Sequence, residues 1–193
     1  MKTQKFFSFN GITPLTWVAI LLLVASCKSK DGNAQSSQSK VAVPKVDIHT
    51  AVLTENLEAL QQHISAGSNI NEKDPFGGSS PLITAAVFGK AKMAKVLIDA
   101  GADLNFQNKD GSTALHTAAF FCRPEIVKML LAKGADKSIK NNFSSTAYES
   151  VTPPFKDVKG VYDMMGTALA PMGLKLDYSY IEKTRPEIAA MLK

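Results

Sequence analysis

Cysteine is scarce in this sequence: its 193 residues include only two, Cys27 and Cys122. Two cysteines cannot build the disulfide framework that stabilises many small secreted domains, and they supply no pair of thiolates at zinc-binding spacing. Histidine is also rare, and none of the three forms a pair at the helical i, i+4 spacing of a metal site. The sequence therefore predicts no metal site.

Clustered positive charge is absent as well. The 22 lysines and arginines outnumber the 17 acids, giving a formal net charge of +5, but they never form a run of five. Nucleic-acid binding requires a clustered basic face that neutralises phosphates, so we expect no nucleic-acid partner. The Gly77-Gly78 pair also lacks the lysine and serine or threonine of a phosphate-binding P-loop. We therefore expect no cofactor.

The longest apolar run, Trp17–Ala25, has only nine residues. A helix that crosses a bilayer core about 30 Å thick needs about twenty, so this run does not predict a membrane span. A lysine-bearing start followed by a short apolar run is typical of a secretory signal peptide, which we place at residues 1–26.

The run ends in Val24-Ala25-Ser26-Cys27, which resembles the lipobox of bacterial lipoproteins. The resemblance implies lipidation of Cys27 and anchoring in the bacterial cell envelope, at the outer membrane or facing the periplasm. The alternative is that Cys27 is incidental in an ordinary cleavable signal or in an uncleaved anchor. Residues 27–44 are rich in Ser, Gln, Lys and Gly, a composition that buries too little apolar surface to fold. They predict a disordered tether.

The remaining residues, 45–193, contain an internal repeat. Gly78–Ala102 and Asp110–Ala135 share leucine, alanine and glycine positions at a constant offset of 33 residues. The matched positions are Leu82, Ala85, Ala86, Leu97 and Gly101, followed by Leu115, Ala118, Ala119, Leu130 and Gly134. A unit this small cannot bury its apolar face alone, so the period predicts a stacked array.

The phrases DGSTALHTAA at Asp110–Ala119 and LLAKGAD at Leu130–Asp136 resemble an ankyrin repeat. The resemblance implies an all-α solenoid of about four helix-turn-helix units, at residues 45–73, 74–107, 108–140 and 141–193. It also implies that His49 and His116 hydrogen-bond the loop backbone. The loop before the second unit carries one extra residue, which lies on a binding face or is a neutral insertion.

The fourth unit departs from the pattern at Pro153-Pro154, because two prolines cannot lie inside a helix. Its second half returns as Arg185-Pro186-Glu187-Ile188, a copy of Arg123-Pro124-Glu125-Ile126 displaced by 62 residues. We therefore expect the last repeat to be split by an insertion at about residues 152–183. Apolar spacing predicts a helix at Lys156–Ala170 and a short strand at Leu174–Tyr180. The insertion caps the array or contacts a ligand.

In ankyrin proteins, partners contact the hairpin tips and the exposed ends of the first helices, on the concave side of the array. From this resemblance we expect partner contacts at ten positions of the second and third units. They are Phe76, Ser79, Val87, Phe88, Gln107, Lys109, Asp110, Ser112, Phe120 and Phe121. Neighbouring exposed aromatics at Phe88, Phe120 and Phe121 would mark an interaction patch. Alternatively, one or more of them tuck into the groove between repeats or under the insertion.

We expect a monomeric, non-catalytic protein-protein interaction module, lipid-anchored in the envelope. One alternative is an inhibitor or immunity protein that sequesters a single envelope enzyme or toxin. Another is an enzyme whose acid-base groups come from Asp157, Tyr162, Asp163 or Asp177 in the insertion, although no diagnostic spacing pairs them. Cys122 lacks a neighbouring base, so we expect a packed or partly exposed thiol and not a nucleophile.

Overall fold

The computed structural model describes residues 42–193. The expected signal peptide, the lipidation site Cys27 and residues 27–41 of the expected tether lie outside the described residues. Within 42–193 the chain forms eight α-helices and one 3₁₀ helix, and no strand. The all-α prediction is therefore confirmed for this part of the chain.

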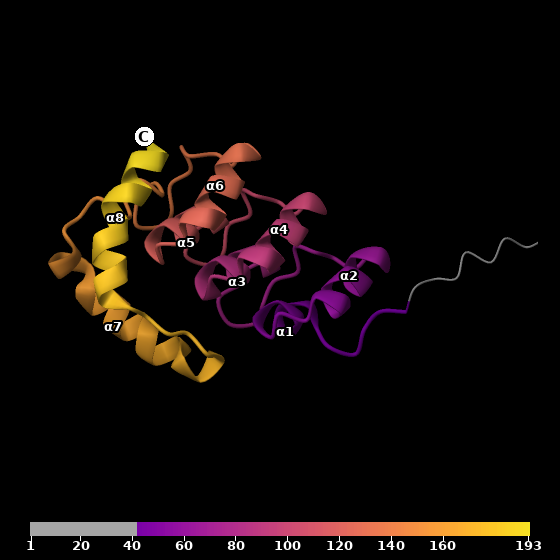
Figure 1. The fold of residues 1–193 in the computed structure, drawn as a ribbon. Coiled ribbons are helices and arrows are strands. Elements are labelled where there is room, and N and C mark those ends of the chain that lie inside the picture. The colour runs from indigo at the N-terminus through magenta and orange to yellow at the C-terminus, as the bar shows by residue number, and fades with distance from the viewer. Residues whose placement is uncertain (1–41) are drawn as a thin grey trace, which may run out of the picture. The chain divides into compact units, whose positions relative to one another are not determined.

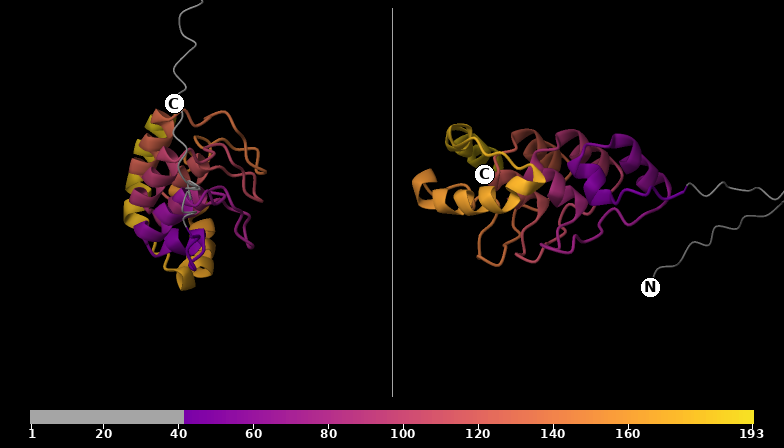
Figure 2. Two further views of the ribbon diagram at one scale, coloured as in Figure 1. Left: turned by 90° about the vertical axis from the view of Figure 1, so that its right-hand side faces the viewer. Right: turned by 90° about the horizontal axis from the view of Figure 1, so that it is seen from below.

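The first three units are helix pairs. They are α1 (Ile48–Leu53) with α2 (Leu57–Ser65), α3 (Pro81–Phe88) with α4 (Ala91–Asp99), and α5 (Ala114–Phe120) with α6 (Pro124–Ala132). The first helices stack side by side in the order α1, α3, α5, and α4 packs against α6 (Figure 1). The loops between units project together to one side of the helices (Figure 2). This is the expected solenoid of helix pairs.

Local sequence explains where these helices begin. Asp47, Asn56, Ser80 and Thr113 each accept a hydrogen bond from a backbone N–H three residues ahead, which satisfies a donor that the helix leaves free. Proline occupies the first turn of α3 and of α6, where a missing N–H breaks no hydrogen bond. Caps and prolines therefore fix the helix starts that the repeat pattern predicts.

The core follows the repeat. All ten matched positions except the two glycines are buried, and Ala85, Ala86, Ala118 and Ala119 are completely inaccessible. Small alanine side chains allow neighbouring first helices to approach closely, and the leucines fill the space between the two helix layers.

The C-terminal region has a different design. Residues 146–151 form a single turn in place of a first helix, and α7 (Phe155–Leu169), the 3₁₀ helix η1 (Ala170–Met172) and α8 (Tyr178–Leu192) follow. The helix predicted at Lys156–Ala170 is confirmed as α7. Helix α8 packs against α6 and α5, so it takes the place of the second helix of a fourth unit.

The predicted strand at Leu174–Tyr180 is wrong. Leu174 is buried and Leu176 is half-buried while Lys175 and Asp177 are exposed, so the alternation in the sequence reflects a real alternation of burial. However, no strand within residues 42–193 offers backbone groups to pair with, and the Asp177 side chain accepts the N–H of Tyr180 and starts α8. The segment is therefore an extended connection that ends at a helix cap.

Candidate protein interface

The three loops between units are hairpins closed by equivalent side chains. Oδ1 of Asp74, Asn108 and Asn141 each accepts two backbone N–H groups of its own hairpin. Burial raises the pKa of Asp74, but the N–H groups of Gly77, Ser79 and Phe76 outweigh it and hold the pKa below its usual value. The Asp74 carboxylate accepts the N–H of Ser79, five residues ahead. The two asparagines accept the N–H of a serine only four residues ahead. The extra residue of the second unit therefore lies at this hairpin tip.

Neighbouring hairpins are joined by backbone hydrogen bonds. The N–H of Lys109 donates to the carbonyl of Gly77 at 3.0 Å, and the N–H of Asn142 donates to that of Asp110 at 2.9 Å. Lys109 Nζ also donates to the carbonyl oxygen of Phe76 at 2.6 Å. The three tips thus form one connected row, which is preorganised for binding because little backbone freedom remains to be lost.

Two large apolar side chains stand out from this row into solvent. Phe76 is 84% exposed and Phe143 is 74% exposed. Phe143 was not among the predicted contacts, although it lies 33 residues after Asp110 and the repeat offset alone could have identified it. Of the predicted hairpin residues, Phe76, Gln107, Lys109 and Asp110 are exposed, and Ser79 and Ser112 are half-buried.

The predicted contacts at the helix ends are less accessible. Val87 and Phe88 are half-buried, and Phe120 is half-buried beneath the ring of Tyr162, whose centroid lies 4.3 Å away. Phe121 is only 3% exposed, which corrects the expectation that it contributes to a partner-binding surface. The chain turns immediately after it, at a positive φ of 53° at Cys122, and Phe121 packs edge-on against Phe120. The alternative of aromatics tucked inward therefore holds for Phe121.

The histidines have structural roles. The Nε2 atom of His49 lies 3.0 Å from the carbonyl oxygen of Glu72, and that of His116 lies 3.0 Å from the carbonyl oxygen of Ser145. Each ring thus bonds the backbone of the following hairpin, as the resemblance implied. His116 is buried, and burial lowers its pKa. His63 is buried in the first unit, with Nε2 2.7 Å from the carbonyl oxygen of Val46.

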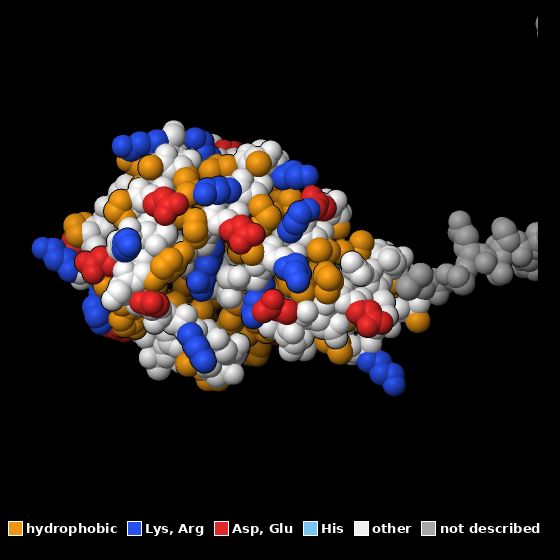
Figure 3. Space-filling model, in the orientation of Figure 1, with side chains coloured by type: hydrophobic (Ala, Val, Ile, Leu, Met, Phe, Trp, Pro, Cys, Tyr) orange, Lys and Arg blue, Asp and Glu red, His pale blue; other side chains and the backbone are white. Residues whose placement is uncertain are grey.

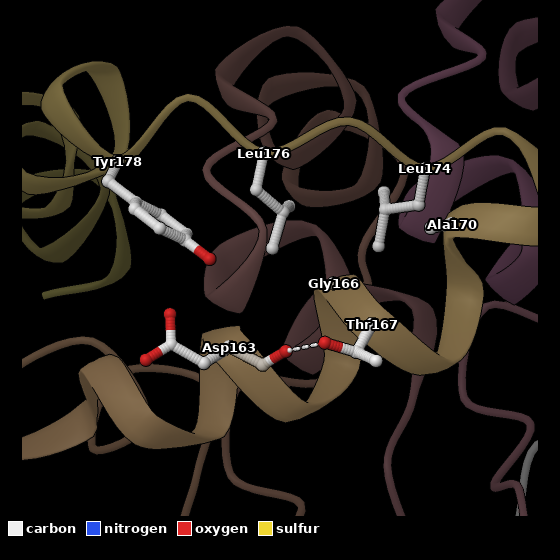
Figure 4. A pocket seen from close by; sticks show the side chains of 7 residues that line it. All are labelled: Asp163, Gly166, Thr167, Ala170, Leu174, Leu176 and Tyr178. Atoms are coloured by element: carbon white, nitrogen blue, oxygen red, sulfur yellow. Dashed lines mark hydrogen bonds between the residues drawn. The ribbon is translucent and has the colours of Figure 1, made fainter.

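The candidate acid-base groups of the insertion do not meet. A depression of about 410 Å³ lies between α7 and residues 174–178, and only Asp163 of the four candidates lines it, opposite Tyr178 (Figure 4). Asp163 pairs with Lys159 at 2.9 Å, and hydrogen bonding to that lysine lowers the Asp163 pKa. Tyr162 is buried and Asp177 caps α8.

Cys122 is fully buried, and burial raises the pKa of its thiol to about 11. Its Sγ lies 3.6 Å from the carbonyl oxygen of Ile181 on α8. A nucleophilic cysteine requires an accessible thiolate, so this environment favours a packing role.

Charges of both signs are interspersed on the face of the molecule drawn in Figure 3, with no extended basic area there. No helix within residues 42–193 has the length and apolar character needed to cross a bilayer. The hairpin row, with its two exposed phenylalanines, is the feature of the described chain best suited to contact another protein.

Comparison with known proteins agrees with this architecture. Residues 48–141 match the family model for ankyrin repeats in three copies. The chain is 38% identical over 64 residues to human "Protein phosphatase 1 regulatory subunit 27", which is 33% of this chain and 41% of that protein. The ankyrin-repeat domain of Bcl-3 superposes with a TM-score of 0.52 at 36% identity, over 53% of this chain and 45% of that one.

The chain thus spans less than half the length of either relative. The matched region nevertheless coincides with the stacked helix pairs, the hairpin row and the histidines that bond the hairpins. Residues 48–141 are therefore three ankyrin repeats, and the chain has the ankyrin-repeat fold of a protein-protein interaction module.

Proposed function

We propose that this protein is a non-catalytic binding module, held on a bacterial envelope membrane by lipid on Cys27, that presents its hairpin row to one protein partner. The observation that carries the proposal is the pair of exposed rings, Phe76 and Phe143, on a backbone fixed by hydrogen bonds. Aromatic side chains contribute much contact area for few rotatable bonds, and they are enriched among the residues that dominate binding energy. The similar human protein is named as a regulatory subunit of protein phosphatase 1, that is, as part of a protein complex.

Lys109 and Asp110 lie on the third-unit hairpin tip, between the two rings in the row. They bring one positive and one negative side chain, both exposed, to a surface that is otherwise apolar at its two ends. We infer that the rings supply affinity and that this charged pair orients the partner, because exposed charges favour correct encounter more than they add binding energy.

The lipid anchor explains why the array would follow a polar segment. Acyl chains contribute about 0.8 kcal/mol per buried methylene, so two or more chains on Cys27 hold a protein stably on a bilayer. A flexible chain of 18 residues, the length of the expected tether, spans about 21–25 Å on average, from about 5–6 Å times the square root of the residue number. That reach would let the hairpin row meet a partner at the same membrane.

The binding surface is tested by crosslinking and affinity capture from envelope membranes, using the tagged full chain. We compare wild type with the double variant Phe76→Ser, Phe143→Ser, and with Met164→Ser as a matched control that removes a 62%-exposed apolar side chain elsewhere. We expect one protein to be retained by wild type and by the control and lost with the double variant. Equal retention by all three would contradict the assignment of the hairpin row.

The anchor is tested separately with Cys27→Ser. We expect wild type in the membrane fraction and the variant in the soluble fraction, with metabolic labelling by a fatty-acid analogue lost in the variant. A variant that remains in the membrane fraction would show that Cys27 does not carry the anchor.

A further inference from the structure

Helix α7 lies along the side of the array formed by the first helices, beneath the end of α5 (Figures 1 and 2). Its attachment is sparse. Of its fifteen residues only Tyr162 is buried, whereas six of the eight residues of α3 are buried. Phe155 and Val158 are half-buried against the core, and Val161 and Met164 are 44% and 62% exposed.

Tyr162 fills a socket built by residues distant in sequence. Its ring stacks on that of Phe120 at 4.3 Å with an interplanar angle of 14°, and its hydroxyl donates to the Phe120 carbonyl oxygen at 2.6 Å. The same hydroxyl accepts a hydrogen bond from Arg185 Nη1 at 2.8 Å. Every polar group of the tyrosine is therefore satisfied, and the socket matches a phenol in shape and in hydrogen bonding.

Arg185 is 3% exposed and forms none of the ion pairs found among residues 42–193. Its Nη2 donates to the carbonyl oxygen of Pro153 at 2.9 Å. Burying a guanidinium without a carboxylate is costly, so each hydroxyl or carbonyl that accepts from it matters. An open socket would therefore favour a new acceptor in place of the Tyr162 hydroxyl.

The C-terminal end of α7 suits a hinge, because Gly173, with a φ of 91°, follows η1. At the N-terminal end Pro153 and Pro154 fix the backbone and the Pro153 carbonyl accepts from Arg185, so this end is an anchor about which α7 can pivot.

No backbone hydrogen bond joins α7 to another helix in the described chain. Tyr162 bonds Phe120 and Arg185. On the exposed side, Asp163 hydrogen-bonds Tyr178 of α8, and Lys159 Nζ lies 4.9 Å from the Tyr178 ring centroid. The helix can therefore swing away without breaking secondary structure on either side.

The socket belongs to a repeated position. Leu53, Val87 and Phe120 lie at equivalent places in the last turn of the three first helices, and all three are half-buried. Tyr162 covers the third of them. The insertion thus occupies, from within the chain, part of the surface on which the resemblance placed partner contacts.

We propose that α7 is a hinged flap held shut by Tyr162, and that the socket beneath it accepts a tyrosine side chain of a protein partner when the flap opens. The tyrosine would stack on Phe120, donate its hydroxyl to the Phe120 carbonyl and accept from Arg185, as Tyr162 does in the closed state. This inference rests on the proposed function, because the partner that contacts the hairpins is the one that would supply the tyrosine. Because only open molecules bind, the apparent association constant equals that of the open state multiplied by the fraction of molecules that are open.

Flap opening is measured by hydrogen exchange of the full chain, comparing wild type with Tyr162→Ala and with Met164→Ala on the exposed side of the same helix. We expect α7 in wild type to exchange at least about tenfold faster than α5 and α6, since local opening needs less free energy than global unfolding. Tyr162→Ala should accelerate α7 about tenfold more and leave α3 and α4 unchanged, while Met164→Ala should match wild type. Exchange of α7 at the rate of α5 in wild type, or equal effects of the two variants, overturns the flap.

The socket is tested with a labelled peptide of residues 155–169, added to the full chain up to about 1 mM, a range that detects weak binding. We expect it to bind the Tyr162→Ala protein, whose own flap cannot fill the socket, and to bind wild type at least about tenfold more weakly. Replacing the tyrosine of the peptide by alanine should abolish binding. Failure of the peptide to bind the Tyr162→Ala protein, or binding that survives loss of the peptide tyrosine, overturns the socket.

The two proposals fail in different ways. Suppose that a partner is captured through Phe76 and Phe143 while the amide hydrogens of α7 exchange no faster than those of α5. This result would overturn the flap and leave the binding module intact. In the opposite case, α7 exchanges fast and the peptide binds Tyr162→Ala, but the hairpin variants do not change capture. That result would support the flap and contradict the hairpin row as the binding surface.

Discussion

The three helix pairs and the C-terminal region after residue 145 are stabilised in different ways. In the repeats, the contacts that hold the hairpins recur: Asp74, Asn108 and Asn141 close three hairpins, and His49 and His116 each bond a following hairpin. In the C-terminal region, Tyr162 and Arg185 make contacts that have no equivalent elsewhere in the described chain. Stability of an array is a sum over neighbouring units, whereas the C-terminal region depends on individual side chains.

A four-residue sequence that occurs once in each region illustrates this difference. Arg123-Pro124-Glu125-Ile126 and Arg185-Pro186-Glu187-Ile188 are identical in sequence. Arg123 precedes α6, and its Nη2 donates to the carbonyl oxygen of Val87 at 3.1 Å in the unit before. Arg185 lies within α8, with Pro186 inside the helix, and bonds Tyr162 of the insertion. Identical sequence therefore acquires a different role when its neighbours change.

The largest expected effect comes from deleting Thr184–Lys193. This removes the buried side chains of Ile188 and Leu192, each worth about 2–5 kcal/mol by analogy with large-to-small substitutions, and uncovers α6. We expect the midpoint of thermal unfolding to fall by about 10 °C or more, while circular dichroism still shows a helical array because its units support one another. Deletion of the exposed Lys193 alone is the control. An unchanged midpoint would show that α8 does not complete the array.

A pair of leucine substitutions compares the two regions directly. Leu115→Ala in α5 removes a 1%-exposed side chain and should reduce the free energy of unfolding by about 3 kcal/mol in a urea titration. Leu169→Ala at the end of α7 removes a half-buried side chain and should cost about 1 kcal/mol or less. Equal losses would mean that α7 is as firmly packed as the repeats, which contradicts the comparison.

The hairpin row offers a finer test because the chain supplies its own control. Asp74→Ala removes the acceptor of three backbone N–H groups and should reduce the free energy of unfolding by about 1–2 kcal/mol. Asp74→Asn keeps the Oδ1 acceptor that the asparagines use at the two equivalent positions but replaces Oδ2, which accepts the N–H of Ser79, so it should cost less than Asp74→Ala but should not match wild type. If both variants unfold like wild type, the tips are not held by these side chains.

The smallest expected effect is a dependence on pH through His116. Burial lowers the pKa of His116 from its ordinary value of 6.5, so the folded protein binds this proton less readily than the unfolded chain. Its contribution is complete above about pH 6.5 and is lost as pH falls toward the lowered value, by at most about 1.4 kcal/mol per pH unit. Carboxyl groups with lowered pKa titrate at lower pH, below this window.

A chemical-denaturation series from pH 7.5 to 5, in steps of about half a unit, should therefore show a slope in the free energy of unfolding that His116→Gln removes. An identical slope in the variant would assign it to other groups.

The sequence predicted the hairpin tips better than the helix ends. Phe76, Gln107, Lys109 and Asp110 are exposed as expected, because hairpin tips point away from the helices whatever packs behind them. Phe120 and Phe121 end α5 and the turn after it, where exposure depends on what lies opposite. Tyr162, which covers Phe120, is 42 residues away in sequence, and no local pattern connects the two.

The sequence alone determined the period of 33, the helix starts of the second and third units and the hairpin positions. Caps, turns and a repeated apolar pattern act between residues close in the chain or one unit apart. The family resemblance added the histidines that bond the hairpins. Only the tertiary structure decided that Phe121 is buried, that α8 continues through Pro186 and that α7 lies over Phe120. These outcomes depend on which surfaces remain unpaired at the end of the array. Contacts such as Cys122 with Ile181, 59 residues apart, form only once the units have stacked.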